Sequence, residues 1–159
     1  MRTLTSRIAS VLVPAVLLLS GCGGDESGTP LRSGALTAEY AGTAFTPVNG
    51  FATTYMGKGV VVLGDGPVHC GSESANDPPS GRNASFSITT LTPGTYGTVF
   101  VQLFENVSSF HGVGASKGNV TITSVSAESV AGMISFDYTA DDGKHYAING
   151  NFDVVHCAP

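Results

Sequence analysis

Apolar residues recur at every second position through the last third of the chain. Residues 130–138 alternate in this way, and residues 146–154 alternate again after a short polar break. This period of two is typical of half-buried β-strands, whose successive side chains point to opposite faces. The break contains Asp141-Asp142-Gly143, in which the glycine supplies the positive φ that many tight turns require. The pattern therefore predicts a long β-hairpin.

Shorter alternating stretches precede this hairpin, with Gly-rich turns between them. We predict strands at residues 36–40, 51–56, 60–63, 84–89, 99–104 and 120–122. The stretch 99–104 has apolar residues on both faces, so we expect it to be buried on both sides. Residues 75–82 and 110–117 are predicted to be polar loops. Roughly seven to nine strands in one domain favour an all-β fold, either an antiparallel β-sandwich or a flattened barrel.

Composition and charge exclude several classes of protein. Hydrophobic residues make up 42% of the chain and charged residues only 12%, which suits a packed core and not an electrolyte-like disordered chain. The formal net charge is −5 and the cations are scattered, so we expect no nucleic-acid partner. No phosphate-binding or dinucleotide motif is present, and the carboxylates form no recognisable pair for glycoside hydrolysis. We therefore expect no enzyme activity and no cofactor.

The first 21 residues are organised like a secretory leader. Arg2 and Arg7 precede an apolar run over residues 8–19, which is too short to cross a bilayer core of about 30 Å as a permanent helix. Leu19-Ser20-Gly21-Cys22 follows at once, and it resembles the lipobox of bacterial lipoproteins. The resemblance implies a signal peptide over residues 1–21 and a lipidated Cys22 bearing several acyl chains, such as palmitate. Two or more acyl chains are enough for stable membrane attachment.

The lipoprotein resemblance also implies a location for the protein. Residues 22–34 are rich in Gly, Ser and Pro, which predicts a flexible tether before a folded domain over residues 35–159. Gly23 follows the cysteine, and in diderm bacteria this resembles cargo of the outer membrane. We expect an exported protein of the cell envelope whose membrane partner is reached through the lipid at Cys22. Without the leader, five cations face twelve acids, a net charge of −7.

Two cysteines remain in the expected domain, Cys70 and Cys157. Pairs of cysteines in exported proteins are usually oxidised to disulfides. Their wide separation is unlike the Cys-x-x-Cys spacing of redox sites. We therefore predict a structural disulfide between them.

A histidine precedes each of these cysteines, at His69 and His156. Side chains next to bridged cysteines in extended segments point away from them, so both imidazoles could share one face. They could then hold Cu or Zn, with His111 or His145 as a third ligand. No H-x-H or H-x₃-H spacing supports this site, and the simpler interpretation is two partly exposed polar residues. We keep metal binding as an alternative hypothesis and assign no metal ligand.

Residues 114–118 match the G-x-S-x-G pattern, with Ser116 at the position of a nucleophile. A nucleophile elbow requires a strand before the serine and a helix after it. Here a strand-like stretch over residues 120–122 follows instead. We therefore interpret the pattern as a Gly-rich turn between strands.

The predicted hairpin resembles that of small, uncharacterised β-rich lipoproteins of bacterial envelopes. The likeness is carried by residues 132–136, the turn at 141–143 and residues 149–154. That family supplies no activity and no catalytic residues. The resemblance implies a non-catalytic domain with a structural, adhesive or binding role, and a small-ligand or metal site near His69 and His156 is the alternative. Candidates for an exposed aromatic binding surface are Tyr40, Tyr55, Tyr96, Phe100, Phe104 and Phe110.

Overall fold

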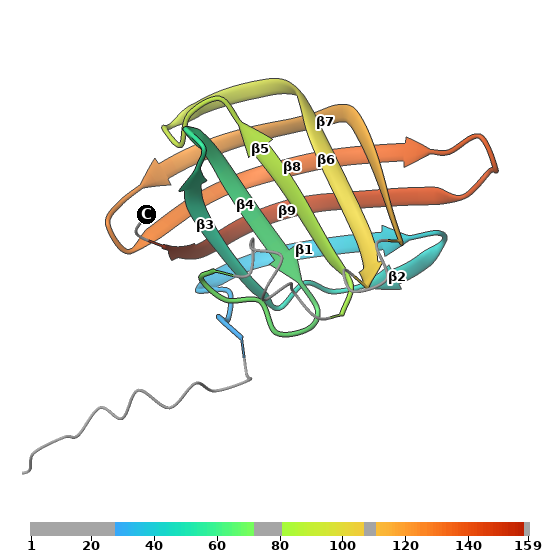
Figure 1. Cartoon of the computed structure of the whole chain (residues 1–159), viewed down its shortest axis with the longest axis horizontal. Helices are drawn as coiled ribbons and strands as arrows, with labels where there is room; N and C mark the ends of the chain where they lie inside the picture. Colours follow the sequence, from blue (N-terminus) through green and yellow to red (C-terminus); the bar gives the residue numbers. More distant parts are fainter. Residues whose placement is uncertain (1–27, 72–80, 107–110, 158–159) are drawn as a thin grey trace, which may run out of the picture.

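The chain folds into a closed β-barrel (Figure 1). The structure is a computed structural model that describes residues 28–71, 81–106 and 111–157. Within these residues the strands are β1 (Ser33–Tyr40), β2 (Thr43–Phe45), β3 (Asn49–Tyr55), β4 (Lys58–Gly64), β5 (Asn83–Ile88), β6 (Gly94–Asn106), β7 (His111–Val125), β8 (Ser129–Thr139) and β9 (His145–His156). They form one sheet in the order β2-β1-β9-β3-β4-β5-β6-β7-β8, and β8 pairs again with β9. The all-β class is thus confirmed, and the sheet closes on itself as a seven-stranded barrel instead of splitting into a sandwich.

The predicted hairpin is confirmed as β8 and β9. The two strands pair antiparallel over their whole length, from Ser129↔Val155 to Thr139↔His145. Their turn is closed by hydrogen bonds from Ala140 N to Lys144 O and from Gly143 N to Ala140 O, both 2.9 Å. Alternate side chains point into the barrel, where apolar residues from every strand form a buried core. The largest fully buried ones in this core are Phe136, Phe152, Leu63, Leu103, Ile122 and Ile148.

The barrel closes at β9, whose two edges pair with three other strands. One edge pairs with β8, and the other pairs first with β1, over Ser33↔Asp153 to Glu39↔Ala147. Further along, the same edge pairs in parallel with β3 at Phe51↔Val155 and Ala52↔His156. Close approach of β1 requires a glycine in β9, because a Cβ on Gly150, at φ +130°, would overlap the carbonyl oxygen of Ala35. We call the short contact between β3 and β9 the seam.

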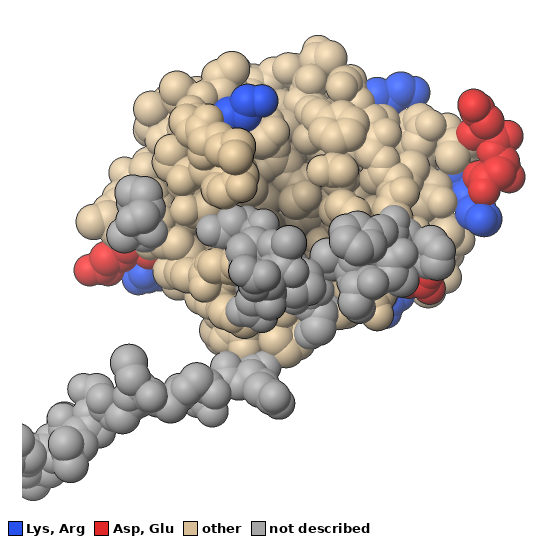
Figure 2. All heavy atoms as spheres, viewed as in Figure 1, with Lys and Arg blue, Asp and Glu red and all other residues tan. Residues whose placement is uncertain are grey.

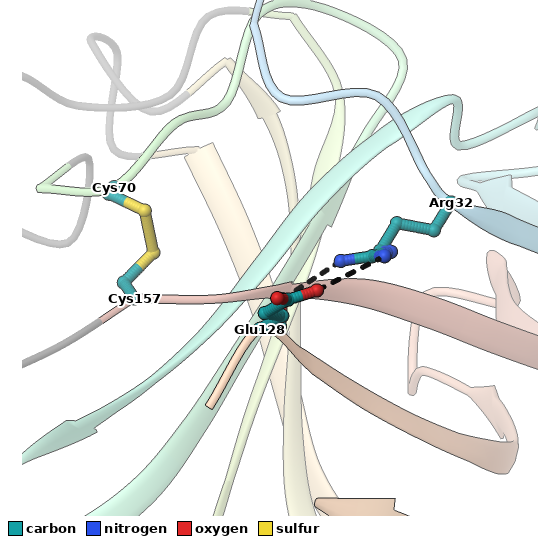
Figure 3. Close-up of a disulfide and its surroundings, with 4 residues drawn as sticks. All are labelled: Arg32, Cys70, Glu128 and Cys157. Atoms are coloured by element: carbon teal, nitrogen blue, oxygen red, sulfur yellow. Dashed lines mark hydrogen bonds and ion pairs between the residues drawn. A yellow bond between two sulfur atoms is a disulfide. The ribbon is translucent and has the colours of Figure 1, made fainter. Parts of the chain in front are cut away.

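A second hydrophobic cluster lies over the seam, separate from the core inside the barrel. It consists of Phe51, Val62, Val68 and Cys157, all less than a tenth exposed. Val68 belongs to the segment after β4, which thus packs against β3 and β4. The predicted disulfide joins this segment to the end of β9, with Cα atoms of Cys70 and Cys157 5.6 Å apart (Figure 3).

Two predictions about β6 and β7 are wrong. Residues 111–117, predicted to belong to a loop, are the first half of β7 and pair with β6. Glycine alternates there because aromatic rings of β6 lie against it: a Cβ on Gly114 would be 2.6 Å from the Phe100 ring, and one on Gly112 would be 2.5 Å from that of Phe104. Phe100 is therefore on the outer face and 45% exposed, so β6 is buried on its inner face alone.

The chain joins the barrel before β1 begins. Thr29 N donates to Val68 O at 2.6 Å, and Leu31 N donates to Val48 O at 2.9 Å. Arg32 N donates to Asp153 O, and its guanidinium pairs with Glu128 at 3.8 Å (Figure 3). Residues 28–34, which the sequence analysis assigned to the tether, are thus hydrogen-bonded to the barrel.

The predicted leader and Cys22 lie outside the described residues. In the described part of the chain, no helix is long and apolar enough to cross a membrane.

Candidate functional site at the barrel mouth

One end of the barrel opens into a cavity of about 680 Å³, which we call the mouth. The end of β1, the turn after it and the start of β9 contribute to one part of its wall, and the end of β4, the start of β5 and the end of β6 contribute to another. Its lining includes two tyrosines, two cations and two carboxylates: Tyr40, Tyr146, Arg82, Lys144, Asp65 and Glu105. Cavities of this size are typical of small-molecule sites.

A row of aromatic rings leads from the mouth along the inner faces of β1, β9 and β8. The rings of Tyr40 and Tyr146 meet edge to face with centroids 5.2 Å apart, and Tyr146 stacks on Tyr138 at 6.4 Å. Phe136 ends the row, 6.4 Å from Tyr138. Strand alternation explains the row, because Tyr138 and Tyr146 are directly paired and Tyr40 follows two residues after Ala38, which pairs with Ile148.

Asp65 and Arg82 lie side by side at the mouth, where β4 ends next to the start of β5, and they are bound together. Arg82 Nε contacts Asp65 Oδ2 at 2.9 Å, and the backbone N of Arg82 donates to Asp65 Oδ1 at 2.7 Å. The guanidinium also lies over the Phe45 ring, 5.2 Å from its centroid, and Nη1 donates to Ala44 O at 3.3 Å. These contacts fix Arg82 before any ligand arrives, which is the preorganisation that binding sites need.

Lys144 and Glu105 differ in how their charges are balanced. Lys144 Nζ pairs with Asp142 at 3.1 Å, and this hydrogen bond raises the pKa of Lys144. The pKa of Asp142 is lowered, first by the hydrogen bond from the backbone N of Lys144 and then by its side chain. Glu105 has no ion-pair partner among the described residues. Burial, then the charges of Tyr146 and Glu105, raise the pKa of Tyr40, so its phenol stays neutral.

His145 ties three strands together beside the mouth. Its Nδ1 is 2.9 Å from Glu39 Oε1 on β1, and its Nε2 is 3.1 Å from Asp137 Oδ2 on β8. A neutral imidazole has one N–H, whereas the charged form donates from both nitrogens. The hydrogen bond with Glu39, followed by that with Asp137, therefore raises the pKa of His145. Lys144 and Tyr146, its neighbours in sequence, both line the mouth.

The histidine side chains that the structure describes belong to no group of three potential metal ligands. His156 Nδ1 donates to Ser126 O at 2.5 Å, His69 is half-buried, and His145 is held by carboxylates. The side chain of His111 lies outside what the structure describes. No group of three His, Cys, Asp or Glu in the described ranges could hold a metal ion.

The other sequence candidates take structural positions. Ser116 pairs with Phe100 inside β7, so the G-x-S-x-G stretch is neither an elbow nor the predicted turn. Tyr55 is exposed at the end of β3, and the Tyr96 hydroxyl donates to Thr92 O at 2.8 Å. Phe110 lies outside the described residues. Of the aromatic candidates that the structure describes, Tyr40 alone is among the residues that line the mouth.

Charged residues are sparse on the face of the molecule shown in Figure 2, and acidic ones gather where Figure 1 places the β8–β9 turn. That turn carries Asp141, Asp142 and Lys144. Arg82, Glu105 and Lys144 were not predicted from the sequence as site residues. Their one local signal is position, because each lies within two residues of a strand end.

Comparison of the chain with protein-family models, with curated proteins and with solved structures found no match. The candidate site therefore rests on the geometry of this chain's own residues.

We expect His145 to titrate above the usual histidine pKa of about 6.5, because both carboxylates favour its charged form. A raised pKa in the folded state means that the pairing stabilises the protein below pH 6.5, and that this stability is lost as the pH rises through the raised pKa. An NMR titration of the imidazole measures the midpoint. Glu39→Gln should lower it, whereas Asp141→Asn, in the exposed turn, serves as the control. A midpoint at or below 6.5 in the unaltered protein contradicts the pairing of His145 with the two carboxylates.

Proposed function

We propose that the protein is a lipid-anchored, non-catalytic binding protein of the cell envelope, and that the barrel mouth is its ligand site. The mouth cavity is the observation that carries the proposal. The interior of the barrel is filled by its own side chains, as is usual for small barrels, so the space for a ligand lies at the end. A purely structural role would not require an open cavity with fixed charged groups.

The groups of the mouth are set in place by contacts within the protein. Arg82 is held by Asp65, Ala44 and the Phe45 ring, and Tyr146 is only 7% exposed between Tyr40 and Tyr138. Rigid donors and rings lose little conformational entropy when a ligand binds, so a small site can still bind with useful affinity. This rigidity favours a binding role over a flexible adhesive surface.

The anchor part of the proposal follows from the lipobox and from where the barrel begins. Thr29 is already hydrogen-bonded to Val68 and Gly50. Residues 23–28 therefore separate Cys22 from Thr29, and six residues reach at most about 20 Å when fully extended. A lipid on Cys22 would thus hold the start of the barrel close to the membrane surface.

Replacing the lipidated residue tests the anchor. We expect Cys22→Ser, expressed as the full chain in a bacterial host that processes lipoproteins, to leave the membrane pellet for the soluble fraction. A Cys70→Ser/Cys157→Ser variant is the control, because it also loses cysteines but keeps the anchor. Cys22→Ser that stays in the membrane pellet contradicts the anchor.

Blocking the mouth tests the ligand site. A screen of small polar and aromatic compounds against the ¹⁵N-labelled mature protein should perturb amides at Gly81, Arg82, Gly112 and Lys144. Thr43→Trp places a large ring at the mouth and should abolish these shifts. Thr95→Trp, at another exposed strand position outside the mouth, is the matched control and should not. If no compound perturbs the mouth, the proposed site is wrong.

A further inference from the structure

The ion pairs of the mouth leave one carboxylate without a counter-ion. Arg82 is paired with Asp65, and Lys144 is paired with Asp142. Glu105 faces the same cavity, and no Lys, Arg or His whose side chain the structure describes pairs with it. Residues 72–80 and 107–110 contain no Lys, Arg or His at all. A ligand that carries a positive charge would therefore meet a carboxylate that no ion pair engages.

The aromatic wall beside Glu105 offers a second attraction for a cation. The faces of aromatic rings carry negative charge density and attract ammonium and guanidinium groups. The chain already uses this interaction twice at this end of the barrel. Lys117 Nζ lies 5.0 Å from the centroid of Tyr138, and the Arg82 guanidinium carbon lies 5.2 Å from that of Phe45.

The chain's own cations do not fill this position. Lys144 is directed to Asp142, and its side chain is 57% exposed. Lys117 is on Tyr138, one ring further along the row than Tyr146. Tyr40 and Tyr146 line the cavity together with Glu105. Burial is the first cause that raises the pKa of Tyr40, and the charge of Glu105 adds to it.

We propose that the mouth binds a small organic cation, an alkylammonium group, whose charge lies between the Glu105 carboxylate and the rings of Tyr40 and Tyr146. This inference rests on the proposed function, because it names the ligand class of the same site. Anions are disfavoured by Asp65 and Glu105, and by a mature chain in which twelve acids outnumber five cations. The long-range field of such a chain draws cations toward the mouth.

Choline and its uncharged carbon isostere, in which a tert-butyl group replaces trimethylammonium, separate charge from shape. We expect choline to bind the mature protein and to shift the amides around Glu105 and Tyr146 in NMR titrations. The isostere should bind at least about tenfold more weakly, because cation–π and carboxylate attraction together exceed about 1.4 kcal/mol. Glu105→Gln should weaken choline binding by a smaller factor, because the rings remain, and should not affect the isostere. Glu128→Gln, which removes an exposed carboxylate that pairs with Arg32 away from the mouth, is the control.

A ring variant tests the aromatic half of the site. Tyr40→Phe keeps the ring and should retain choline binding, whereas Tyr40→Leu should lose most of it. Circular dichroism of both variants checks that the barrel is intact, and the Phe variant remains informative if the Leu variant does not fold.

The outcomes distinguish this inference from the proposed function. If choline and its isostere bind the mouth equally, or Glu105→Gln changes nothing, the cation assignment is overturned while the mouth remains a binding site. If choline shifts only amides elsewhere on the barrel, or does not bind, the cation assignment is also overturned. The proposed function itself is contradicted only by a broader result, namely that no compound in the screen perturbs the amides of the mouth.

Discussion

The structure depends on the seam where β9 meets β3. Every other strand pairing in the barrel is antiparallel and extends over at least five registered pairs, but the seam consists of Phe51↔Val155 and Ala52↔His156. One more backbone bond follows, from Cys157 N to Ala52 O at 2.8 Å. Closing a sheet removes its exposed edges, so these few contacts decide whether the fold is a barrel or an open sheet. The disulfide and the second hydrophobic cluster lie directly against them.

The disulfide suits this position because it closes a long loop. Cys70 and Cys157 are 87 residues apart, and the chain-entropy model gives roughly 4–5 kcal/mol for constraining a loop of that length in the unfolded chain. In the folded protein the same bond holds the end of β9 against the segment that covers β3 and β4. The mouth in turn requires closure, because β9 carries Tyr146 and begins directly after Lys144, while β4, β5 and β6 end or begin beside Asp65, Arg82 and Glu105.

Local patterns in the sequence predict where strands lie better than they predict which residues of other strands lie beside them. The β8–β9 hairpin follows from alternation and from Asp141-Asp142-Gly143, because both signals lie within about 25 residues. The first half of β7 could not be recognised, since its glycines are explained only by the Phe100 and Phe104 rings on β6. The disulfide was predictable because two cysteines leave one pairing. The lipid anchor on Cys22 remains a prediction from the lipobox.

The mouth is hidden from sequence for a related reason. Tyr40, Arg82, Glu105 and Tyr146 come from four different strands or strand ends, and their meeting depends on the register of the closed sheet. Arg82 and Lys144 resemble ordinary solvated charges in the sequence, and Asp65 resembles a turn residue. Glu105 differs from Asp65, the other carboxylate that lines the mouth, in having no ion pair among the described residues, and this difference becomes visible only in the fold.

Native-state hydrogen exchange of the oxidised and the reduced protein tests the role of the seam most directly. If the disulfide holds the barrel closed, reduction should speed the exchange of the Cys157 amide and of the β3 amides beside it, while amides inside the β8–β9 hairpin keep their protection. Unchanged protection at the seam after reduction, or an equal loss of protection in the seam and the hairpin, would contradict this account.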